Sequence, residues 1–367
     1  MVSVPESSDN AKRGVEMSNW EKNIRRVTPY VPGEQPKLQK MIKLNTNENP
    51  YPPSPEVQRL LEEMSADTFR LYPDPAASEL VQAIACRYGV DEKQIFVGVG
   101  SDDVLAMAFL TFFNSGLPVF FPDITYSFYD VWADTFRIPY RQIPLNDRFE
   151  ICPEDYAAPN GGVIFPNPNA PTGVALEPGS VEQIVRANQD SVVIVDEAYV
   201  DFGAVSALPL IRKYDNLLVV QTFSKSRSMA GMRIGFAIGD EKLIRFLQDV
   251  KYSFNSYTMN RTAIVLGAAA VRDEAWFRET VGRITATRER TQSVLREMGF
   301  QCRDSAANFV FVSHERVPAG DIFRALRERN IFVRYFDRPR IRNYLRITIG
   351  TDEEMDRLFA ALQEILA

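Results

Sequence analysis

Lys225 is the residue of this chain best suited to covalent chemistry. It stands between Ser224 and Ser226, shortly after the apolar run 217–220, and Arg233 follows eight residues later. An uncharged lysine amine is a nucleophile toward aldehydes, and partial burial favours that uncharged form. Lys225 can therefore form a Schiff base with an aldehyde. A single lysine is more often a solvated surface residue, so this interpretation depends on companion residues elsewhere in the chain.

A carboxylate and a phenol follow a second apolar run. Asp196 comes directly after 192–195, and Tyr199 lies three residues further on. A buried carboxylate requires a cationic partner or several hydrogen-bond donors. A protonated pyridine nitrogen would be such a partner, and Tyr199 would donate to the O3′ oxygen of the same ring, so the pair suits pyridoxal phosphate. A magnesium-binding aspartate or a helix cap is the alternative interpretation of Asp196.

A turn suited to phosphate follows the apolar run 94–99. Gly100, Ser101 and Asp102 come next, where an apolar helix is expected to begin, so free backbone amides would face an anion. Asp103 stands where a dinucleotide-binding fingerprint has its third glycine, which argues against a nicotinamide site. A plain strand-to-helix turn would explain the same residues.

An aromatic ring and several amides follow two further apolar runs. Tyr126 comes after 117–121 and offers a flat ring for stacking on a pyridine, although a buried core tyrosine fits the same pattern. The run 162–165 leads into a turn rich in proline and asparagine. An asparagine amide in that turn can donate to O3′ beside Tyr199.

The runs that precede these residues are apolar throughout and alternate with helical patterns, as does 234–238. This arrangement predicts an α/β fold with a mostly parallel central sheet covered by helices. Ligands of such sheets bind at the carboxyl ends of the strands, which is where all the residues above are expected to lie.

The pattern changes toward the carboxyl end. A helix is expected at 275–298, and strands at 308–312 and 345–349 bracket a helix at 321–329. We therefore predict a disordered tail, an N-terminal arm, a large α/β domain and a smaller α+β domain, at 1–18, 19–44, 45–265 and 266–367.

Composition excludes several other classes of protein. The 367 residues are 45% hydrophobic and 25% charged, as in ordinary globular proteins, and the net charge of −6 favours neither nucleic acid nor an anionic membrane as partner. No apolar run approaches the ~20 residues needed to cross a bilayer. The three cysteines lack metal or disulfide spacing, so a cytoplasmic protein is expected. The single histidine, His314, argues against a histidine-ligated metal.

Taken in order, these motifs resemble the fold type I pyridoxal-phosphate aminotransferases from about residue 20 to the end. Within that superfamily the sequence is most similar to the histidinol-phosphate aminotransferase branch. The segments that carry this resemblance are 44–50, 71–73, 100–102, 196–199, 224–226 and 345–348.

The resemblance implies roles for the residues around the cofactor, pyridoxal 5′-phosphate. Lys225 would bind the aldehyde and then move a proton between the substrate Cα and the cofactor C4′. Asp196 would pair with the ring nitrogen, Tyr199 would donate to O3′ and Tyr126 would stack on the ring. The phosphate would be held by Ser224, Arg233 and the amides of the Gly100-Ser101-Asp102 turn.

The resemblance also implies a partner and a substrate site. Tyr72 would reach the cofactor phosphate of the neighbouring subunit, which implies a homodimer with shared active sites. Arg346 would bind the substrate α-carboxylate, and Arg334 and Tyr30 would receive a distal phosphate. Arg334 could instead face water, as some of its neighbours Arg338, Arg340 and Arg342 must.

One position departs from the superfamily pattern. Members commonly have asparagine directly before Pro-Thr-Gly, where this chain has Ala170. Either Asn169 or Asn167 takes over the bond to O3′, or Tyr199 makes it alone; we assign Asn169.

The implied reaction is a ping-pong amino transfer from a small amino donor to a 2-oxo acid, with L-histidinol phosphate and 2-oxoglutarate as the expected pair. An aromatic amino-acid aminotransferase and a decarboxylase of a phosphorylated amino acid are the nearest alternatives. A non-catalytic ligand sensor is more remote, because such proteins usually carry a DNA-binding module and the segment before residue 20 is too short for one.

Overall fold

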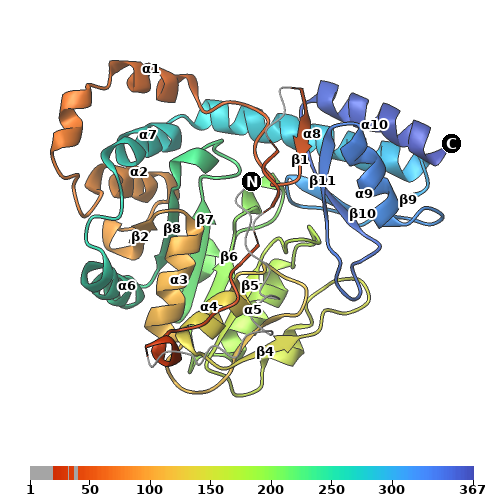
Figure 1. Cartoon of the computed structure of the whole chain (residues 1–367). Coiled ribbons are helices and arrows are strands. Elements are labelled where there is room, and N and C mark those ends of the chain that lie inside the picture. The colour runs from red at the N-terminus through yellow and green to blue at the C-terminus, as the bar shows by residue number, and fades with distance from the viewer. Residues whose placement is uncertain (1–19, 32, 37–39) are drawn as a thin grey trace.

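The computed structural model describes residues 20–31, 33–36 and 40–367. The tail predicted at 1–18 lies outside the described residues. A seven-stranded sheet forms the centre of the first part of the chain (Figure 1). Its strands, in spatial order, are β2 (Ile95–Gly98), β8 (Gly235–Gly239), β7 (Leu217–Thr222), β6 (Val193–Asp196), β5 (Gly162–Pro166), β3 (Val119–Pro122) and β4 (Tyr140–Ile143).

The sheet is parallel except at one strand. β8 runs antiparallel to both of its neighbours, β2 and β7, whereas the pairs from β7 to β4 are all parallel. The predicted mostly parallel α/β sheet is therefore confirmed.

Apolar residues fill both faces of this sheet because successive residues of a strand point to opposite sides. Val163 and Phe165 of β5 lie in one core, and Ile164 between them lies in the other. The first core is covered by α1 (Pro55–Glu63), α2 (Ser78–Tyr88), α5 (Pro178–Ala187) and α7 (Arg261–Arg272). The second is covered by α3 (Ser101–Phe112), α4 (Tyr129–Phe136) and α6 (Glu241–Phe254).

A second, five-stranded sheet combines the two ends of the chain. Its strands, in spatial order, are β1 (Ile42–Leu44), β11 (Ile331–Tyr335), β12 (Leu345–Thr348), β10 (Phe309–His314) and β9 (Phe300–Cys302). Only β1 pairs in parallel, with β11. Helices α8 (Glu274–Glu297), α9 (Ala319–Glu328) and α10 (Asp352–Leu366) pack with this sheet around a third core. This is the predicted smaller α+β unit with a contribution from the arm.

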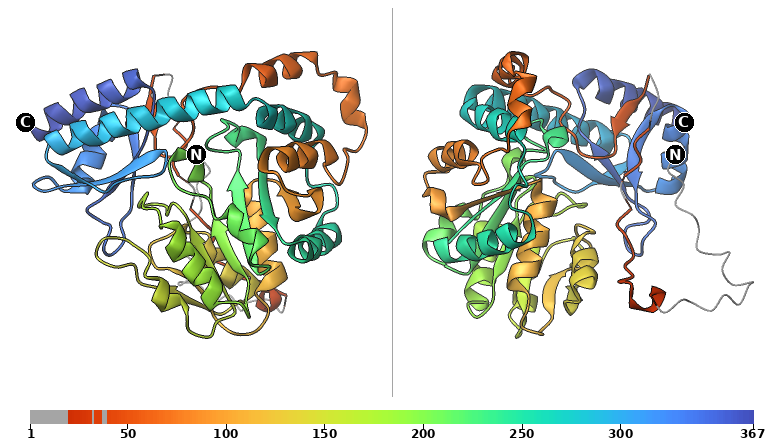
Figure 2. Two further views of the ribbon diagram at one scale, coloured as in Figure 1. Left: turned by 180° about the vertical axis from the view of Figure 1, so that it is seen from behind. Right: turned by 60° about the vertical axis from the view of Figure 1, so that its left-hand side comes forward.

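The boundary predicted at 265 falls inside α7. That helix packs against α1 and α2 and places Ile264 and Leu266 in the first core. The long helix α8 then leads from α7 to the second sheet, as Figure 1 and the left view of Figure 2 show.

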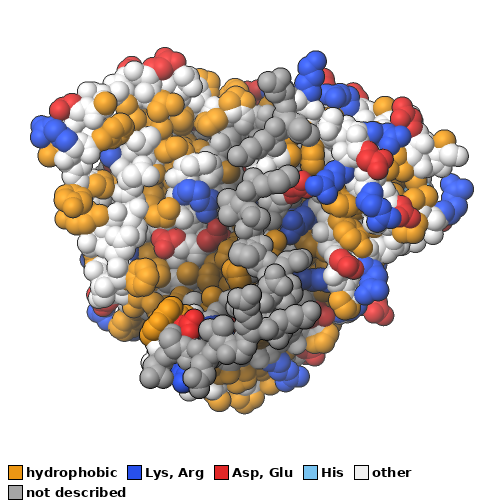
Figure 3. All heavy atoms as spheres, viewed as in Figure 1, with side chains coloured by type: hydrophobic (Ala, Val, Ile, Leu, Met, Phe, Trp, Pro, Cys, Tyr) orange, Lys and Arg blue, Asp and Glu red, His pale blue; other side chains and the backbone are white. Residues whose placement is uncertain are grey.

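The surface seen in Figure 3 has acidic and basic side chains intermingled over the carboxyl-terminal part of the chain. In the described part of the chain no helix combines the length and the apolar character needed to cross a membrane.

Candidate active site

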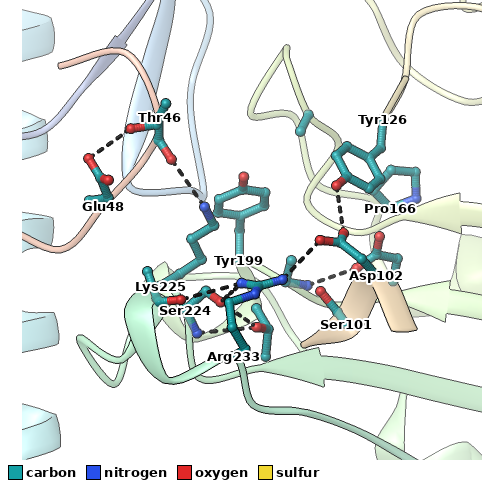
Figure 4. A pocket seen from close by; sticks show the side chains of 15 residues that line it. Thr46, Glu48, Ser101, Asp102, Tyr126, Pro166, Tyr199, Ser224, Lys225 and Arg233 are labelled. Atoms are coloured by element: carbon teal, nitrogen blue, oxygen red, sulfur yellow. Dashed lines mark hydrogen bonds and ion pairs between the residues drawn. The ribbon is translucent and has the colours of Figure 1, made fainter. Parts of the chain in front are cut away.

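A pocket opens at the carboxyl ends of three neighbouring strands (Figure 4). Pro166, Asp196 and Thr222 end β5, β6 and β7, and all three line it. Parallel strands end at the same edge of a sheet, whatever the length of the segments that connect them. Residues far apart in the chain therefore meet at this edge. The remaining lining residues are Thr46, Glu48, Ser101, Asp102, Tyr126, Ala170, Ala198, Tyr199, Ser224, Lys225, Ala230 and Arg233.

Lys225 points into this pocket from the loop that follows β7. Its Nζ donates to the carbonyl oxygen of Thr46 at 3.2 Å and lies 5.7 Å from the centre of the Tyr199 ring. The backbone on either side is fixed, because Asn49 Nδ2 donates to the Lys225 carbonyl at 3.0 Å and Ser226 Oγ donates to the half-buried Asp201. The amine thus extends into the pocket from a residue whose main chain is held.

Asp196 is buried at the base of the pocket. Tyr129 donates its hydroxyl to Oδ2 at 2.8 Å, and the Ala198 amide donates to Oδ1 at 3.2 Å. Burial is the largest influence on this carboxyl and raises its pKa to about 6, although both hydrogen bonds act in the opposite direction. A cation placed in the pocket would restore the charged form of Asp196.

The start of α3 supplies backbone donors. Its N-cap is Gly100, which has φ of +86° and no side chain to cap the helix, so the first amides have no capping partner. Ser101 and Asp102, which carry the first of these amides, line the pocket. Arg233 lies beside them, with Nη2 3.0 Å from Asp102 Oδ2 and Nη1 3.4 Å from Ser224 Oγ. A Cβ at position 100 would collide with the Arg233 guanidinium. Only glycine at position 100 lets Arg233 lie this close to the start of α3. The α3 amides and the Arg233 guanidinium together suit an anionic ligand.

Tyr126 forms one wall of the pocket. Its hydroxyl donates to Asp102 Oδ1 at 2.7 Å, and its ring meets that of Tyr129 edge-on, with centres 5.7 Å apart. Burial and the nearby Asp102 carboxylate raise the pKa of Tyr126 well above its ordinary value, so this phenol stays protonated. The hydroxyl therefore acts as a donor that helps to orient Asp102.

A second pocket adjoins the first and contains two arginines. Arg334 and Arg346 are direct cross-strand partners on β11 and β12, so both side chains extend from the same face. Their guanidinium carbons lie 5.5 and 5.6 Å from the centre of the Phe336 ring. Burial lowers the pKa of Arg346, and its Nε has no hydrogen-bond partner within the described part of the chain. Two adjacent guanidiniums with an unsatisfied donor favour an anionic ligand.

Tyr30 of the arm also lines the second pocket. Its ring stacks on Phe128 at 4.1 Å between centres and 23° between planes. Phe128 in turn stacks on Trp132 at 5.0 Å. The arm is thus held across the pocket by aromatic contacts with the start of α4.

Two predicted site residues lie elsewhere. Tyr72 is 79% exposed, packs against Tyr257 and lines neither of the two pockets. Asn169 is buried, and its Nδ2 donates to the Ile124 carbonyl and to Thr172 Oγ1, both at 3.0 Å. Its two amide hydrogens are therefore already used.

The neighbouring residue, Ala170, lines the pocket instead. Asn167 is also buried, and its Oδ1 accepts from the Leu176 amide at 2.8 Å. This geometry argues against the assignment of Asn169 to O3′. Consecutive residues of an irregular turn point in different directions, which spacing in the sequence does not reveal.

Sequence reasoning assigned no role to several residues of the site. Thr46 and Glu48 line the pocket, and Glu48 forms an ion pair with Lys43. Burial alone would raise the pKa of Glu48, but hydrogen bonds from Lys43 and Thr46 outweigh it, so the pKa is lowered. Tyr129 was likewise missed, since nothing in the apolar helix α4 indicates a contact with Asp196. The segment 44–50 was noticed only for its resemblance.

Within residues 20–31, 33–36 and 40–367, no three or more histidine, cysteine, aspartate or glutamate side chains are grouped so as to hold a metal ion. The polar groups of the two pockets instead suit organic anions.

Known proteins similar to this chain agree with the geometry. Residues 39–362 match the family "Aminotransferase class I and II". A "Histidinol-phosphate aminotransferase 1" from Hydrogenovibrio crunogenus is 54% identical over 347 residues, covering 95% of this chain and 98% of the relative. A "Histidinol-phosphate aminotransferase" from Lactococcus lactis is 49% identical over 348 residues, with the same shares covered.

Solved structures give the same result. The crystal structure of histidinol-phosphate aminotransferase from Sinorhizobium meliloti in complex with pyridoxal-5′-phosphate superposes with a TM-score of 0.82 and 26% identity, covering 89% of this chain and 91% of that one. The family match spans most of the chain, and the relatives are covered almost from end to end. This chain therefore belongs to the class I and II aminotransferases, among the histidinol-phosphate aminotransferases.

Proposed function

We propose that this chain is a pyridoxal-phosphate-dependent aminotransferase that converts L-histidinol phosphate and 2-oxoglutarate into imidazole-acetol phosphate and glutamate. The observation that best supports the proposal is that the lysine pocket and the arginine pocket adjoin and share lining residues. Lys225 and Tyr199 border both of them, so an amine-bearing ligand at Lys225 would place its anionic end near Arg334 and Arg346.

The residues of the first pocket fit pyridoxal 5′-phosphate. The free amides at the start of α3, together with Arg233 and Ser224, supply backbone and charged donors for a dianionic phosphate. Asp196, which is buried and has a raised pKa, lacks the cation that a protonated ring nitrogen would provide. Tyr199 is available for O3′ and Lys225 Nζ for the aldehyde.

Each of these residues has a part in the reaction. When bound, the cofactor carries the amino group and acts as an electron sink. Lys225 Nζ would bind the cofactor aldehyde and, when released, would move a proton to or from the substrate Cα. Asp196 would stabilise a protonated ring nitrogen, and Tyr126 would pack against the ring.

The arginine pair supports the choice of substrate. L-Histidinol phosphate has no carboxylate, so its phosphate is the anion that the pair must bind. Two guanidiniums suit a phosphate dianion, and one of them can form a two-pronged contact with the carboxylate of glutamate. One pair of residues can therefore serve both half-reactions of a ping-pong cycle.

The assembly and location that we propose follow from other features. Tyr72 is exposed and lines neither of the two pockets, which supports a homodimer in which it reaches the phosphate site of the neighbouring subunit. The three cysteines are free thiols, which supports a cytoplasmic location.

Full turnover tests the proposal. Purified holoenzyme with L-histidinol phosphate and 2-oxoglutarate should form glutamate, and Lys225→Ala should form none and lack the visible absorption of the lysine-bound cofactor. Normal turnover by the Lys225→Ala variant would refute the proposal.

A further inference from the structure

The first pocket has alanine, Ala170, at a position where the superfamily commonly has an asparagine whose amide can donate to the cofactor ring. Ala170 lines the first pocket, and the amide hydrogens of its neighbour Asn169 are committed to Ile124 and Thr172. Asn167 Nδ2 has no hydrogen-bond partner within the described residues, but Asn167 lines neither of the two pockets. Tyr199, which lines both, is therefore the remaining candidate to donate to O3′. A single hydrogen bond from a phenol depends on where its proton points, because the hydroxyl rotates about the C–O bond.

Asn47 is placed to control that proton. Its Nδ2 donates to the Tyr199 oxygen at 2.9 Å, and both side chains are buried. An amide nitrogen is a donor only, so the Tyr199 oxygen must accept this bond. The phenolic proton is then left for a different acceptor, and the pocket is the open direction.

The orientation of the Asn47 amide is itself fixed. The Asn47 backbone amide donates to Thr348 Oγ1 at 3.0 Å, so the Thr348 proton is available for Asn47 Oδ1, also at 3.0 Å. Asn308 Nδ2 donates to the Asn47 carbonyl at 3.0 Å. With Oδ1 held by Thr348, Nδ2 faces Tyr199. Asn47 has φ of +57°, a left-handed conformation that asparagine tolerates better than most residues.

We propose that Asn47 is a positioning residue that fixes Tyr199 as the hydrogen-bond donor to the cofactor O3′, in place of the amide that Ala170 does not supply. This inference rests on the proposed function, since it requires pyridoxal phosphate in the first pocket. It gives a role in the active site to a residue that follows β1, the edge strand of the second sheet, and that lies 152 residues from Tyr199 in sequence.

The bound cofactor reports the state of this bond. The O3′ oxygen and the Lys225 nitrogen share a proton, and a donor to the oxygen weakens its hold on that proton. Loss of the Tyr199 bond therefore raises the pH at which the visible absorption changes. Other charged or titratable groups around the ring site are the same in every variant compared: Glu48, Asp102, Tyr126, Tyr129, Asp196, Arg233 and Arg346.

Two substitutions remove the Asn47 donor in different ways. Asn47→Asp keeps the shape and the oxygen that Thr348 binds, and Asn47→Gly adds no charge and suits the positive φ. Both should raise the pH midpoint of the absorption change by about one unit, a roughly tenfold change in the proton equilibrium. In a Tyr199→Phe background the same substitutions should leave the midpoint unchanged.

Two results would overturn the role of Asn47. One is that the Asn47 substitutions leave the pH midpoint unchanged when Tyr199 is present. The other is that they shift it by the same amount in the Tyr199→Phe background. Circular dichroism and cofactor stoichiometry establish that each variant is folded and loaded. Ala170→Asn does not depend on the stability of the Asn47 variants. Ala170→Asn alone should lower the pH midpoint of the absorption change, and in the Asn47→Gly background it should offset the rise. If Ala170→Asn leaves the midpoint unchanged in both backgrounds, Ala170 does not mark a missing donor.

The two proposals fail in different ways. If pyridoxal phosphate gives no lysine-dependent absorption band with the wild-type protein, the proposed function is wrong. If the band is present, is absent in Lys225→Ala, and keeps its midpoint in the Asn47 variants, only the role of Asn47 is wrong.

Discussion

The two arginines of the second pocket differ in how firmly the surrounding residues hold them. Arg346 is half-buried, donates to the Asn45 carbonyl at 3.1 Å and lies over the rings of both Phe309 and Phe336. Arg334 is half-buried as well, but within the described structure it lies over only one of those rings, that of Phe336. We infer that Arg346 serves every substrate anion and that Arg334 adds to it when the anion is a dianion.

Removal of Arg334 should therefore discriminate between substrates. Arg334→Ala is expected to lower kcat/KM for L-histidinol phosphate by roughly 10- to 100-fold, the value of one or two charged hydrogen bonds. The loss for phenylalanine, which has only a carboxylate, should be several-fold smaller. Arg342→Ala, which removes an exposed arginine nearby, is the control. Equal losses on both substrates would refute the assignment of Arg334 to the phosphate.

At the scale of elements, α3 and β8 meet through a glycine. Gly235 begins β8, where it pairs with Gly98 of β2 and Thr222 of β7. A Cβ at position 235 would collide with the backbone amide nitrogen of Ser101. The absence of a side chain at this point lets the start of α3 approach the end of β7, where Ser224 and Arg233 complete the anion site.

Gly235→Ala should displace the start of α3 and weaken binding of the cofactor phosphate. Overpacking typically costs about 1–3 kcal/mol, so the dissociation constant of pyridoxal phosphate should rise about tenfold or more. Gly231→Ala is the matched control, because a Cβ there meets no atom within 4 Å. Titration of apoprotein with cofactor measures both, and wild-type affinity in Gly235→Ala would contradict this account of α3.

A buried glutamate ties β6 to its neighbours. Glu197 accepts from Ser206 Oγ, the Ala207 amide and Gln221 Nε2 at 2.6–2.8 Å. Burial nevertheless raises its pKa from the ordinary value of 4.5 to about 7. The folded chain thus holds this proton more tightly than the unfolded chain does.

The free energy of unfolding therefore depends on pH through Glu197. Below pH 4.5 both states are protonated, and as the pH rises toward 7 only the unfolded state loses its proton, so stability falls. This group should cost the apoprotein on the order of 3 kcal/mol across that range. Glu197→Gln should show a flatter decline when unfolding is measured from pH 4.5 to 8. If the unfolding free energy of Glu197→Gln falls with pH as steeply as that of the wild type, Glu197 does not titrate as described.

Residues at strand ends were the predictable part of the site. Asp196 and Lys225 follow fully apolar runs, and parallel strands place such residues at one edge of a sheet whatever lies between them. The antiparallel β8 was not predictable, because its apolar run Gly235–Gly239 has the composition of its parallel neighbours. The contacts of Tyr129 with Asp196 and of Asn47 with Tyr199 depend on tertiary packing across 67 and 152 residues.

At the scale of the whole molecule, Tyr72 belongs to a segment with exposed apolar side chains. Phe69 and Leu71 are exposed close to it in sequence, and its ring packs against Tyr257, which is also exposed. Exposed apolar side chains of this kind favour association with another protein surface. A second copy of this chain is the partner that would bring Tyr72 to a phosphate site.

Mixed dimers test this sharing of sites. Lys225→Ala should be inactive, and Tyr72→Ala should bind the cofactor weakly. A mixed dimer has one site with both wild-type residues, so refolding equal amounts together should give about a quarter of wild-type activity. Activity no greater than the sum of the two separate variants would contradict a shared site.

The most direct test of the central claim is the first half-reaction. Wild-type holoenzyme is mixed with single amino donors in the absence of a 2-oxo acid, and the visible absorption of the bound cofactor is followed. L-Histidinol phosphate should abolish the absorption rapidly with one equivalent of imidazole-acetol phosphate per site, and 2-oxoglutarate should restore it. Rapid loss with phenylalanine and none with L-histidinol phosphate would contradict the account.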